Sequence, residues 1–208
     1  MIKTKVIGRV FRQDEIADQI YDMWIETELA QGARPGQFVC VYTKNAAALL
    51  PRPISICEVN EEKTMLRLVY RTVGTGTNEF AAYHAGTEIS LLGPLGNGFP
   101  VEKAAGKRVF LIGGGIGIPP MLQLSKEIKK AGQAYCELSV LGYRNELFLN
   151  TDLEKYSQVY VATEDGSAGT KGTVLDPIKE KALSGDVIFA CGPMPMLRAI
   201  KEYAAANN

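Results

Sequence analysis

Short apolar runs separated by polar turns dominate residues 1–100. Each run is rich in Val, Ile, Thr, Tyr and Phe and has the length of a β-strand, and turn residues such as Arg34-Pro35-Gly36 lie between them. Strands at this spacing predict an antiparallel six-stranded β-barrel. One helix is expected within it, from Thr77 to Tyr83, with Thr77 as its N-cap. The runs are Lys3–Gln13, Ile20–Glu28, Gln37–Thr43, Ile54–Asn60, Met65–Thr72 and Glu88–Leu92.

Beyond residue 100 the pattern changes to strands that alternate with helices. This alternation predicts parallel βαβ units, and therefore an α/β domain with a parallel sheet. Two domains are expected, at residues 1–100 and 101–208, with a linker near Gly93–Gly106. The expected strands are Arg108–Ile112, Glu137–Leu141, Gln158–Ala162 and Val187–Ala190, and the expected helices are Pro119–Ala131, Val174–Leu183 and Pro195–Ala205.

Charge and composition narrow the class of protein. Lys plus Arg and Asp plus Glu both number 23, so the formal charge is zero and no basic face for nucleic acid is expected. The most apolar stretch, Val109–Leu124, carries four Gly and two Pro and is shorter than the roughly 20 residues of a membrane span. The N-terminus has no secretory signal pattern. We therefore expect a cytoplasmic protein without a membrane anchor.

The cysteines and the histidine argue against several kinds of chemistry. Cys40, Cys57, Cys136 and Cys191 lie far apart in sequence, which predicts neither a disulfide framework nor a metal site. The only histidine, His84, lies in a turn, so no Ser-His-Asp or Cys-His arrangement is expected. Hydrolysis is therefore not indicated.

A first candidate site is formed by Arg52-Pro53-Ile54-Ser55 and Gly74-Thr75-Gly76-Thr77. A guanidinium pairs bidentately with a pyrophosphate, and a nearby hydroxyl can bond a flavin ring nitrogen. A glycine-rich turn that opens a helix offers amides and a positive dipole to a phosphate. Each segment alone also fits a surface arginine or a capped turn; together they favour a flavin. Tyr70, on the preceding strand, fits either a flavin contact or the core.

A second candidate site is the glycine run Gly113–Pro120, which lies between a strand pattern and a helix pattern. Glycines permit a close backbone approach to a dinucleotide phosphate, and Pro fits the first turn of a helix. Cys191 ends the last predicted strand, where it either faces the nicotinamide or is a buried structural thiol. The expected NAD contacts are Gly114, Gly115, Gly117, Pro120, Glu164, Asp165, Cys191, Gly192, Pro193 and Met194.

Cofactor preference has signals in both directions. Glu164 and Asp165 follow a predicted strand and fit either a solvated loop or a place near the adenosine ribose, where carboxylates accept hydroxyl bonds and repel a 2′-phosphate. Arg144 follows an earlier strand and suits a 2′-phosphate instead. We predict NAD(H), with NADP(H) as the alternative.

The motifs RPIS, GTGT, LLGPLGNGF, GGGIGIPPM and ACGPMPML occur in this order. With them the chain resembles the ferredoxin–NADP reductase superfamily and, within it, the electron-transfer subunits of NAD-linked dihydroorotate dehydrogenases. The resemblance covers nearly all 208 residues and implies an FAD-binding barrel followed by an NAD-binding domain. The flavin contacts that it implies are Arg52, Pro53, Ile54, Ser55, Val69, Tyr70, Arg71, Gly76 and Thr77.

The resemblance also implies a partner and one difference. Ile54 stands where plant-type reductases have Tyr, which favours the dihydroorotate branch. That branch carries a [2Fe–2S] cluster on a cysteine-rich tail that is absent after Ala204–Asn208, so we expect no metal in this chain; it is either truncated or works without the cluster. The implied partner is an FMN-containing dihydroorotate dehydrogenase catalytic subunit, in a heterotetramer, whose electrons reach NAD⁺ through FAD for pyrimidine synthesis.

Two other functions fit the same motifs. The first is a stand-alone NAD(P)H:flavin or ferredoxin oxidoreductase, which predicts turnover with soluble acceptors and no second subunit. The second is a flavin-binding module that only docks to a partner, which predicts bound FAD that NADH does not reduce.

Overall fold

A computed structural model describes residues 5–45, 47–132 and 134–207 of the chain. It divides into two compact units, Met1–Phe99 and Pro100–Asn208, each with its own core. Lys3 and Thr4, where the first strand was expected to begin, lie outside the described residues.

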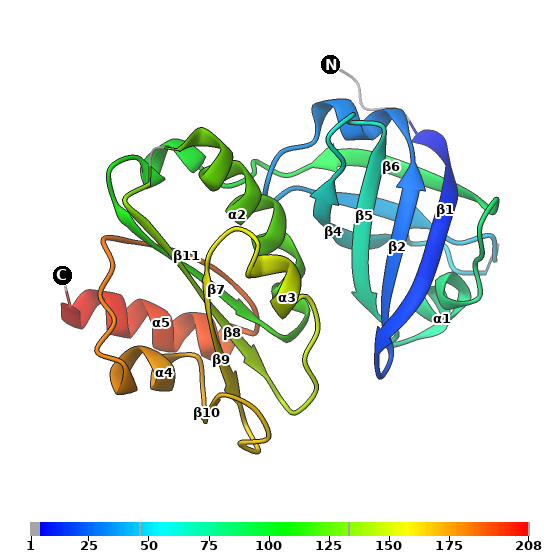
Figure 1. Ribbon diagram of the computed structural model, residues 1–208. Helices are drawn as coiled ribbons and strands as arrows, with labels where there is room; N and C mark the ends of the chain where they lie inside the picture. Colours follow the sequence, from blue (N-terminus) through cyan, green and yellow to red (C-terminus); the bar gives the residue numbers. More distant parts are fainter. Residues whose placement is uncertain (1–4, 46, 133, 208) are drawn as a thin grey trace. The chain divides into compact units, whose positions relative to one another are not determined.

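The first unit is a closed barrel of six antiparallel strands, which confirms the predicted fold (Figure 1). The strands are hydrogen-bonded in the order β1-β2-β5-β4-β3-β6. Their bounds are β1 (Lys5–Ala17), β2 (Ile20–Glu26), β3 (Phe38–Tyr42), β4 (Arg52–Val59), β5 (Met65–Arg71) and β6 (Glu88–Leu95), and the unit also contains a 3-10 turn, η1 (Glu28–Gly32), and a helix, α1 (Thr75–Ala81).

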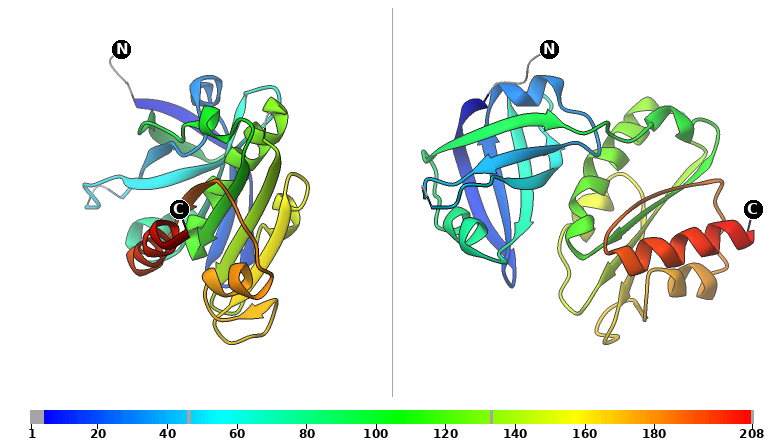
Figure 2. Two further views of the ribbon diagram at one scale, coloured as in Figure 1. Left: turned by 90° about the vertical axis from the view of Figure 1, so that its left-hand side faces the viewer. Right: turned by 180° about the vertical axis from the view of Figure 1, so that it is seen from behind.

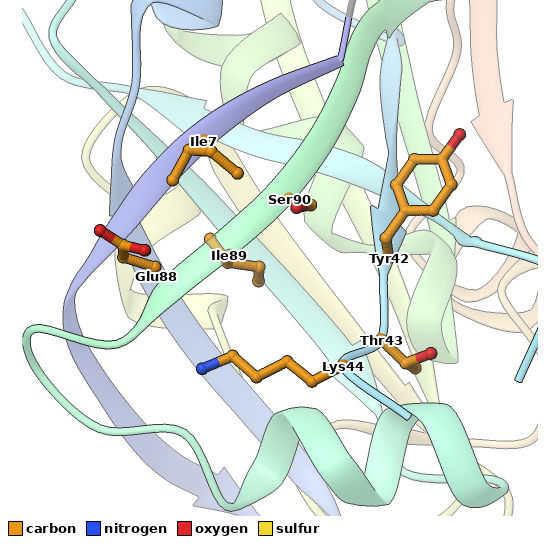
Figure 3. A pocket seen from close by; sticks show the side chains of 7 residues that line it. All are labelled: Ile7, Tyr42, Thr43, Lys44, Glu88, Ile89 and Ser90. Atoms are coloured by element: carbon orange, nitrogen blue, oxygen red, sulfur yellow. The ribbon is translucent and has the colours of Figure 1, made fainter. Parts of the chain in front are cut away.

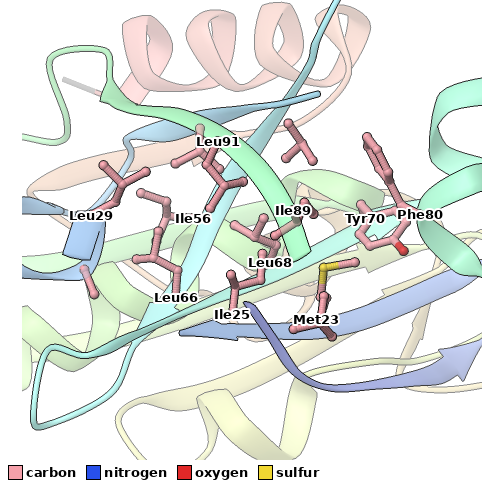
Figure 4. Close-up of a cluster of buried hydrophobic side chains, with 14 of the residues drawn as sticks. Met23, Ile25, Leu29, Ile56, Leu66, Leu68, Tyr70, Phe80, Ile89 and Leu91 are labelled. Atoms are coloured by element: carbon pink, nitrogen blue, oxygen red, sulfur yellow. The ribbon is translucent and has the colours of Figure 1, made fainter. Parts of the chain in front are cut away.

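Alternation along the strands fills the barrel with apolar side chains. Residues two apart on a strand point to the same side of a sheet, so Leu66, Leu68 and Tyr70 of β5 enter one buried cluster (Figure 4). Phe80 of α1 joins this cluster with 1% exposure. It fixes the short helix to the barrel, and Gln13 of β1 adds hydrogen bonds to the carbonyls of Phe80 and Tyr83, both at 2.9 Å.

The second unit is a parallel sheet with helices, as predicted, and it has five strands instead of the four that were expected. The strand order is β10-β9-β8-β7-β11, so the chain leaves β7 in one direction and returns to its other side at β11. The strands are β7 (Arg108–Gly114), β8 (Cys136–Tyr143), β9 (Gln158–Thr163), β10 (Thr170–Lys171) and β11 (Val187–Cys191). The helices are α2 (Pro119–Ala131), α3 (Asn150–Leu153), α4 (Leu175–Glu180) and α5 (Met194–Asn207), with 3-10 turns η2 (Val101–Ala104) and η3 (Gly115–Gly117).

Helices cover both faces of this sheet. Ile178 of α4 and Ile200 of α5 pack into one buried cluster with Phe110 and Ile112 of β7. The helices α2 and α3 lie on the opposite face (Figures 1 and 2). None of the helices in the described residues is long and apolar enough to cross a membrane.

The start of α1 differs from the sequence prediction. Gly74, not Thr77, is the N-cap, and Thr77 is the third residue inside the helix. The Thr77 hydroxyl accepts hydrogen bonds from the amides of Val73 (2.9 Å) and Gly74 (3.3 Å). A threonine at this position therefore ties the helix back to the preceding turn, which a search for N-caps alone does not detect.

Candidate functional site

The strands β4 and β5 pair along only part of their length. Their partnered residues run from Ile56↔Leu68 to Val59↔Leu66, with a bulge between Ile56 and Glu58. On the N-terminal side of Ile56, the residues Arg52–Ser55 of β4 pair with β3. On the C-terminal side of Leu68, the residues Val69–Arg71 of β5 pair with β2. The two predicted flavin-binding segments thus lie on either side of the place where the strands part, and their facing backbone edges are left for a ligand.

Arg52 lies directly against Gly76 of α1. A Cβ on Gly76 would be 2.5 Å from the Arg52 Nε, so glycine at this position lets the guanidinium lie against the start of the helix. Arg52 also donates a hydrogen bond to the carbonyl of Leu50. The structure therefore brings together two segments that are about twenty residues apart in sequence and that were both predicted to meet a phosphate.

The arginines near the place where β4 and β5 part differ in whether a carboxylate pairs with them. Arg67 of β5 is buried and bound by Asp22 (2.8 Å) and Glu58 (3.2 Å). Arg52 and Arg71, in contrast, form no ion pair with a carboxylate of the described residues. Two cations without a fixed anion are what an anionic ligand such as a pyrophosphate needs.

Tyr70 belongs to the barrel core. Its side chain is 2% exposed, its ring stacks on Tyr21 at 5.9 Å, and its hydroxyl donates to Gln13 Oε1 at 2.8 Å. Burial raises the pKa of this phenol well above its usual range. Of the two roles open from sequence, the structure selects the core, so any flavin contact of Tyr70 comes from its main chain.

The remaining flavin candidates differ in accessibility. Ile54 and Ser55 are half-buried, and Pro53 is exposed. Val69 is buried with 2% exposure, and Thr77 with 6%. Pro53, Ile54, Ser55 and Val69 are candidates for holding the flavin ring because they lie where the strands part, whereas Thr77 lies in α1.

The second candidate site lies where the direction of the sheet reverses. Strands β7 and β11 are parallel neighbours, with Gly113 opposite Cys191. The glycine run Gly113–Gly117 and the segment Cys191–Pro193 lie at the ends of these two strands, so the chain returns to the same edge of the sheet after the 73 residues between Gly117 and Cys191. Ligands of open α/β sheets bind at the carboxyl ends of the strands at such a reversal.

The glycines of the run have different roles. A Cβ on Gly113 would be 2.9 Å from the Ile118 Cα, one on Gly114 2.4 Å from the Met196 Sδ, and one on Gly117 2.3 Å from the Cys191 carbonyl oxygen. Only Gly115 of these four has no neighbour within 4 Å, and its φ is +53°. Three glycines therefore serve close packing of the turns, and Gly115 is the one with open space for a ligand.

Cys191 is half-buried at the end of β11, and burial raises the pKa of its thiol. The thiol therefore stays protonated at neutral pH and is a poor nucleophile. Gly192 is half-buried, while Pro193 and Met194 are exposed. Pro120, in the first turn of α2, is buried. The buried or half-buried members hold the turn, and the exposed ones are open to a ligand.

Glu164 and Asp165 follow β9, two strands from β7. Adjacent strands are about 4.8 Å apart, so these carboxylates lie about 10 Å along the edge from the glycine run. Hydrogen bonds from the Ser167 amide (2.9 Å) and hydroxyl (2.7 Å) lower the pKa of Asp165. Glu164 and Arg144 are both exposed. The carboxylate that favours NAD(H) and the guanidinium that favours NADP(H) are therefore both accessible to a ligand.

A hollow elsewhere on the barrel unit does not coincide with these residues. It has a volume of about 160 Å³ and lies between β1, β6 and the segment after β3 (Figure 3). None of the flavin candidates lines it. Among the described residues, no group of three or more His, Cys, Asp or Glu side chains is placed to hold a metal ion.

Sequence reasoning missed two residues at these sites. The Gln13 side-chain amide donates hydrogen bonds to the carbonyls of Phe80 and Tyr83 and so helps to hold α1 in place. A glutamine in a strand of alternating polar and apolar residues gives no sign of such a role in the sequence. Met196 packs against glycines of both turns after β7 and β11. Its place in ACGPMPML was visible, yet only the fold brings Gly114 beside it.

Comparison with known proteins agrees with this architecture. The family "Oxidoreductase NAD-binding domain" matches residues 111–202. The electron transfer subunit of dihydroorotate dehydrogenase B (NAD(+)) from Geobacillus sp. (strain WCH70) is 42% identical over 198 residues, covering 93% of this chain and 76% of the relative. The same subunit from Bacillus caldolyticus is 42% identical over 206 residues, covering 95% and 79%.

Solved structures have the same fold. The NADH-dependent reduced ferredoxin–NADP oxidoreductase matches with a TM-score of 0.86 and 29% identity, over 96% of this chain and 72% of that one. A ferredoxin NADP⁺ reductase from Neisseria gonorrhoeae with bound FAD and NADP matches with a TM-score of 0.82 and 15% identity, over 98% and 92%. The latter likeness concerns the fold alone.

Proposed function

Since the chain belongs to the family of electron transfer subunits of dihydroorotate dehydrogenase B (NAD(+)), we propose that it passes electrons from a partner dehydrogenase subunit to NAD⁺ in pyrimidine biosynthesis. It is an oxidoreductase component, and FAD and NAD(H) are its cofactors. The observation that carries the proposal is the presence of one nucleotide-binding arrangement in each unit: the parted strands β4 and β5, and the paired turns after β7 and β11.

The residues of the first unit fit an FAD. Arg52 and Arg71 supply positive charge for its phosphates, Gly76 leaves room for the Arg52 guanidinium, and Ser55 offers a hydroxyl at the strand edge. The remaining proposed contacts are Pro53, Ile54, Val69, the main chain of Tyr70, and Thr77. The open edges of the parted strands give a planar ring backbone amides and carbonyls to bond.

The residues of the second unit fit NAD(H). Gly115 leaves open space for the pyrophosphate, and Cys191 with its neighbours forms the adjoining wall. When bound, the two cofactors supply the chemistry, a hydride exchanged between nicotinamide C4 and flavin N5. This chain's residues therefore need only bind and orient, which agrees with a Cys191 thiol that stays protonated.

Three finer points also belong to the proposal. We propose that the partner is an FMN-containing dihydroorotate dehydrogenase catalytic subunit and that the assembly is a heterotetramer. A cytoplasmic location is consistent with four free cysteines. We also propose domains at residues 1–100 and 101–208, each holding one cofactor.

The experiment is an absorbance spectrum of the purified, FAD-loaded chain before and after anaerobic NADH. Bleaching of the flavin bands by NADH supports electron transfer, whereas bound FAD that NADH leaves oxidised would favour the docking module. Steady turnover with ferredoxin, together with no binding to a dihydroorotate dehydrogenase catalytic subunit, would favour the stand-alone reductase. The same assay with NADPH tests the preference for NAD(H), and faster reduction by NADPH would contradict it.

A further inference from the structure

Met196 of α5 fills the space between two turns that follow neighbouring strands. A Cβ on Gly114, at the end of β7, would be 2.4 Å from the Met196 Sδ. A Cβ on Gly192, after β11, would be 2.4 Å from the Met196 Cε. One thioether therefore contacts a glycine of each turn.

The backbone of Gly114 does not itself require glycine. Its φ of −123° and ψ of 120° are an extended conformation that any residue adopts. The space for a side chain at this position is limited by neighbouring residues. Besides the Met196 side chain, a Cβ on Gly114 would meet the Pro193 Cδ at 3.3 Å. Gly114 therefore leaves out a side chain to make room for Met196.

The turns meet at a second point as well. A Cβ on Gly117 would be 2.3 Å from the Cys191 carbonyl oxygen and 2.7 Å from the Gly192 Cα, so backbone lies on backbone there. Met196 is also half-buried against the cluster that contains Ile112 and Ile200. It thus joins both turns to the core of the second unit.

We propose that Met196 is a positioning residue for nicotinamide nucleotide binding. Its thioether sets the spacing between the Gly113–Gly117 turn and the Cys191–Pro193 turn, so that both sides of the nucleotide site are held as one rigid piece. An unbranched thioether suits such an irregular gap. The inference rests on the proposed function, because it requires NAD(H) to bind at these turns. Displacements of about 1 Å in such a site can cost up to about 100-fold in rate.

The first test compares Met196→Ala and Met196→Leu with Ile200→Val in the FAD-loaded chain. Calorimetric titration measures NAD⁺ binding, and anaerobic mixing with NADH measures flavin reduction. We expect Met196→Ala to weaken NAD⁺ binding about tenfold with an unchanged FAD spectrum, since the turns lose their common support. Met196→Leu, close in volume, should stay within about twofold of the wild type. Ile200→Val, which trims the same core cluster, should lower the unfolding temperature but not NAD⁺ binding.

The second test needs no cofactor. Gly114→Ala alone should lower the unfolding temperature because the new methyl group meets the Met196 Sδ. In the Met196→Ala background the same substitution should have little effect, because the space has been vacated. Additive effects would overturn the proposed packing role. NAD⁺ binding by Met196→Ala equal to that of the wild type would overturn the positioning role, whereas a wild-type chain that binds no NAD⁺ would instead refute the proposed function.

Discussion

Arg52 is the residue on which flavin retention is expected to depend most. Its guanidinium packs on Gly76 and has no carboxylate partner in the described residues, so its charge is available to a phosphate. A charge-assisted hydrogen bond is worth about 1.5–3 kcal/mol. Arg52→Ala should therefore weaken FAD binding roughly 10- to 100-fold.

Equilibrium dialysis of FAD measures this effect, with Arg12→Ala as the matched control. Arg12 is exposed on β1 and forms an ion pair with Asp14 at 3.8 Å, far from the proposed flavin contacts in sequence, so its loss should leave FAD binding unchanged. Heat-released flavin should be FAD and not FMN, because FMN has no pyrophosphate for Arg52 to hold. A single FMN peak on chromatography, or unweakened binding by Arg52→Ala, would be evidence against this assignment.

Gly115 and Gly117 should respond very differently to a methyl group. At Gly117 the added Cβ would lie 2.3 Å from the backbone oxygen of Cys191, which cannot rotate away. Gly117→Ala should therefore destabilise the fold by about 2–3 kcal/mol. At Gly115 there is open space, and the cost of φ +53° is only about 1 kcal/mol.

The expected result is a division of effects between stability and binding. The unfolding temperature should fall mainly in Gly117→Ala, whereas the KM for NADH should rise mainly in Gly115→Ala, whose methyl group would occupy the open space proposed for the nucleotide. Equal loss of stability in both variants would contradict the separate roles that the packing assigns to them.

These glycines also show what a sequence can predict of a single residue. The run predicted a close approach of backbone to a dinucleotide phosphate, whereas the close approaches at Gly113, Gly114 and Gly117 are to groups of the protein itself. The identity of the approaching group was not predictable, since Gly114 and Gly117 meet Met196 and Cys191 from the far end of the domain. Tyr70 illustrates the same limit, because a tyrosine in a strand fits either the core or a ligand until the barrel closes around it.

Among the elements, α2 and β8 share one half-buried carboxylate. Glu137 of β8 accepts a hydrogen bond from the Ser125 hydroxyl of α2, and burial raises its pKa to about 7 although Ser125 and Lys129 act in the opposite direction. A carboxyl whose pKa is higher in the folded chain than in the unfolded chain stabilises the fold only while protonated. Its contribution is complete below about pH 4.5 and is lost as the pH rises through about 7.

Glu137→Gln should remove this pH dependence. Because the amide carbonyl can still accept from Ser125, the variant should gain about 1–3 kcal/mol relative to the wild type between pH 5 and pH 8. Urea unfolding at several pH values measures the difference. Glu202→Gln, an exposed carboxylate on α5, is the control and should show no such gain. A constant difference between Glu137→Gln and the wild type would refute the prediction.

The elements themselves were largely predictable where local signals agree. The helix Pro119–Ala131 has its prolines at the start and Gly132 at φ +62° after its end, and its bounds match the prediction. Strand β1 was expected to end at Gln13, but it continues to Ala17 as a hairpin with β2. Strand β10, only two residues long, and the four-residue α3 are too short to give a periodic signal.

For the whole molecule, the succession of strand patterns predicts both fold classes, yet not the order in which strands pair. Two features of the site depend on that order: the parting of β4 from β5 and the adjacency of β7 and β11. Both result from hydrogen bonds between segments distant in sequence, which local propensity does not encode. Motif order along the chain supplied this information indirectly, through resemblance to proteins in which the order is known.

The distribution of the four cysteines bears on which electron carriers the chain can hold. Cys40 lies opposite Pro53, so Cys57 is four residues farther along β4, about 13 Å away. In the second unit Cys136 lies opposite Arg108 and Cys191 opposite Gly113, five residues apart along β7 or about 17 Å. The two cysteines within each unit are therefore too far apart to ligate one iron–sulfur cluster.

We accordingly predict that these 208 residues bind FAD without an iron–sulfur centre. The FAD-loaded chain should exchange electrons with NADH and with artificial acceptors such as ferricyanide. Coupling to a dihydroorotate-oxidising partner should be slow, because electron tunnelling between two flavins without an intermediate carrier is slow. Adding a cysteine-rich tail of the plant-type spacing should accelerate reduction of NAD⁺ by dihydroorotate, while a tail with those cysteines changed to serine should not. Stoichiometric iron and acid-labile sulfide in the chain without the tail, or equal coupling with both tails, would contradict this prediction.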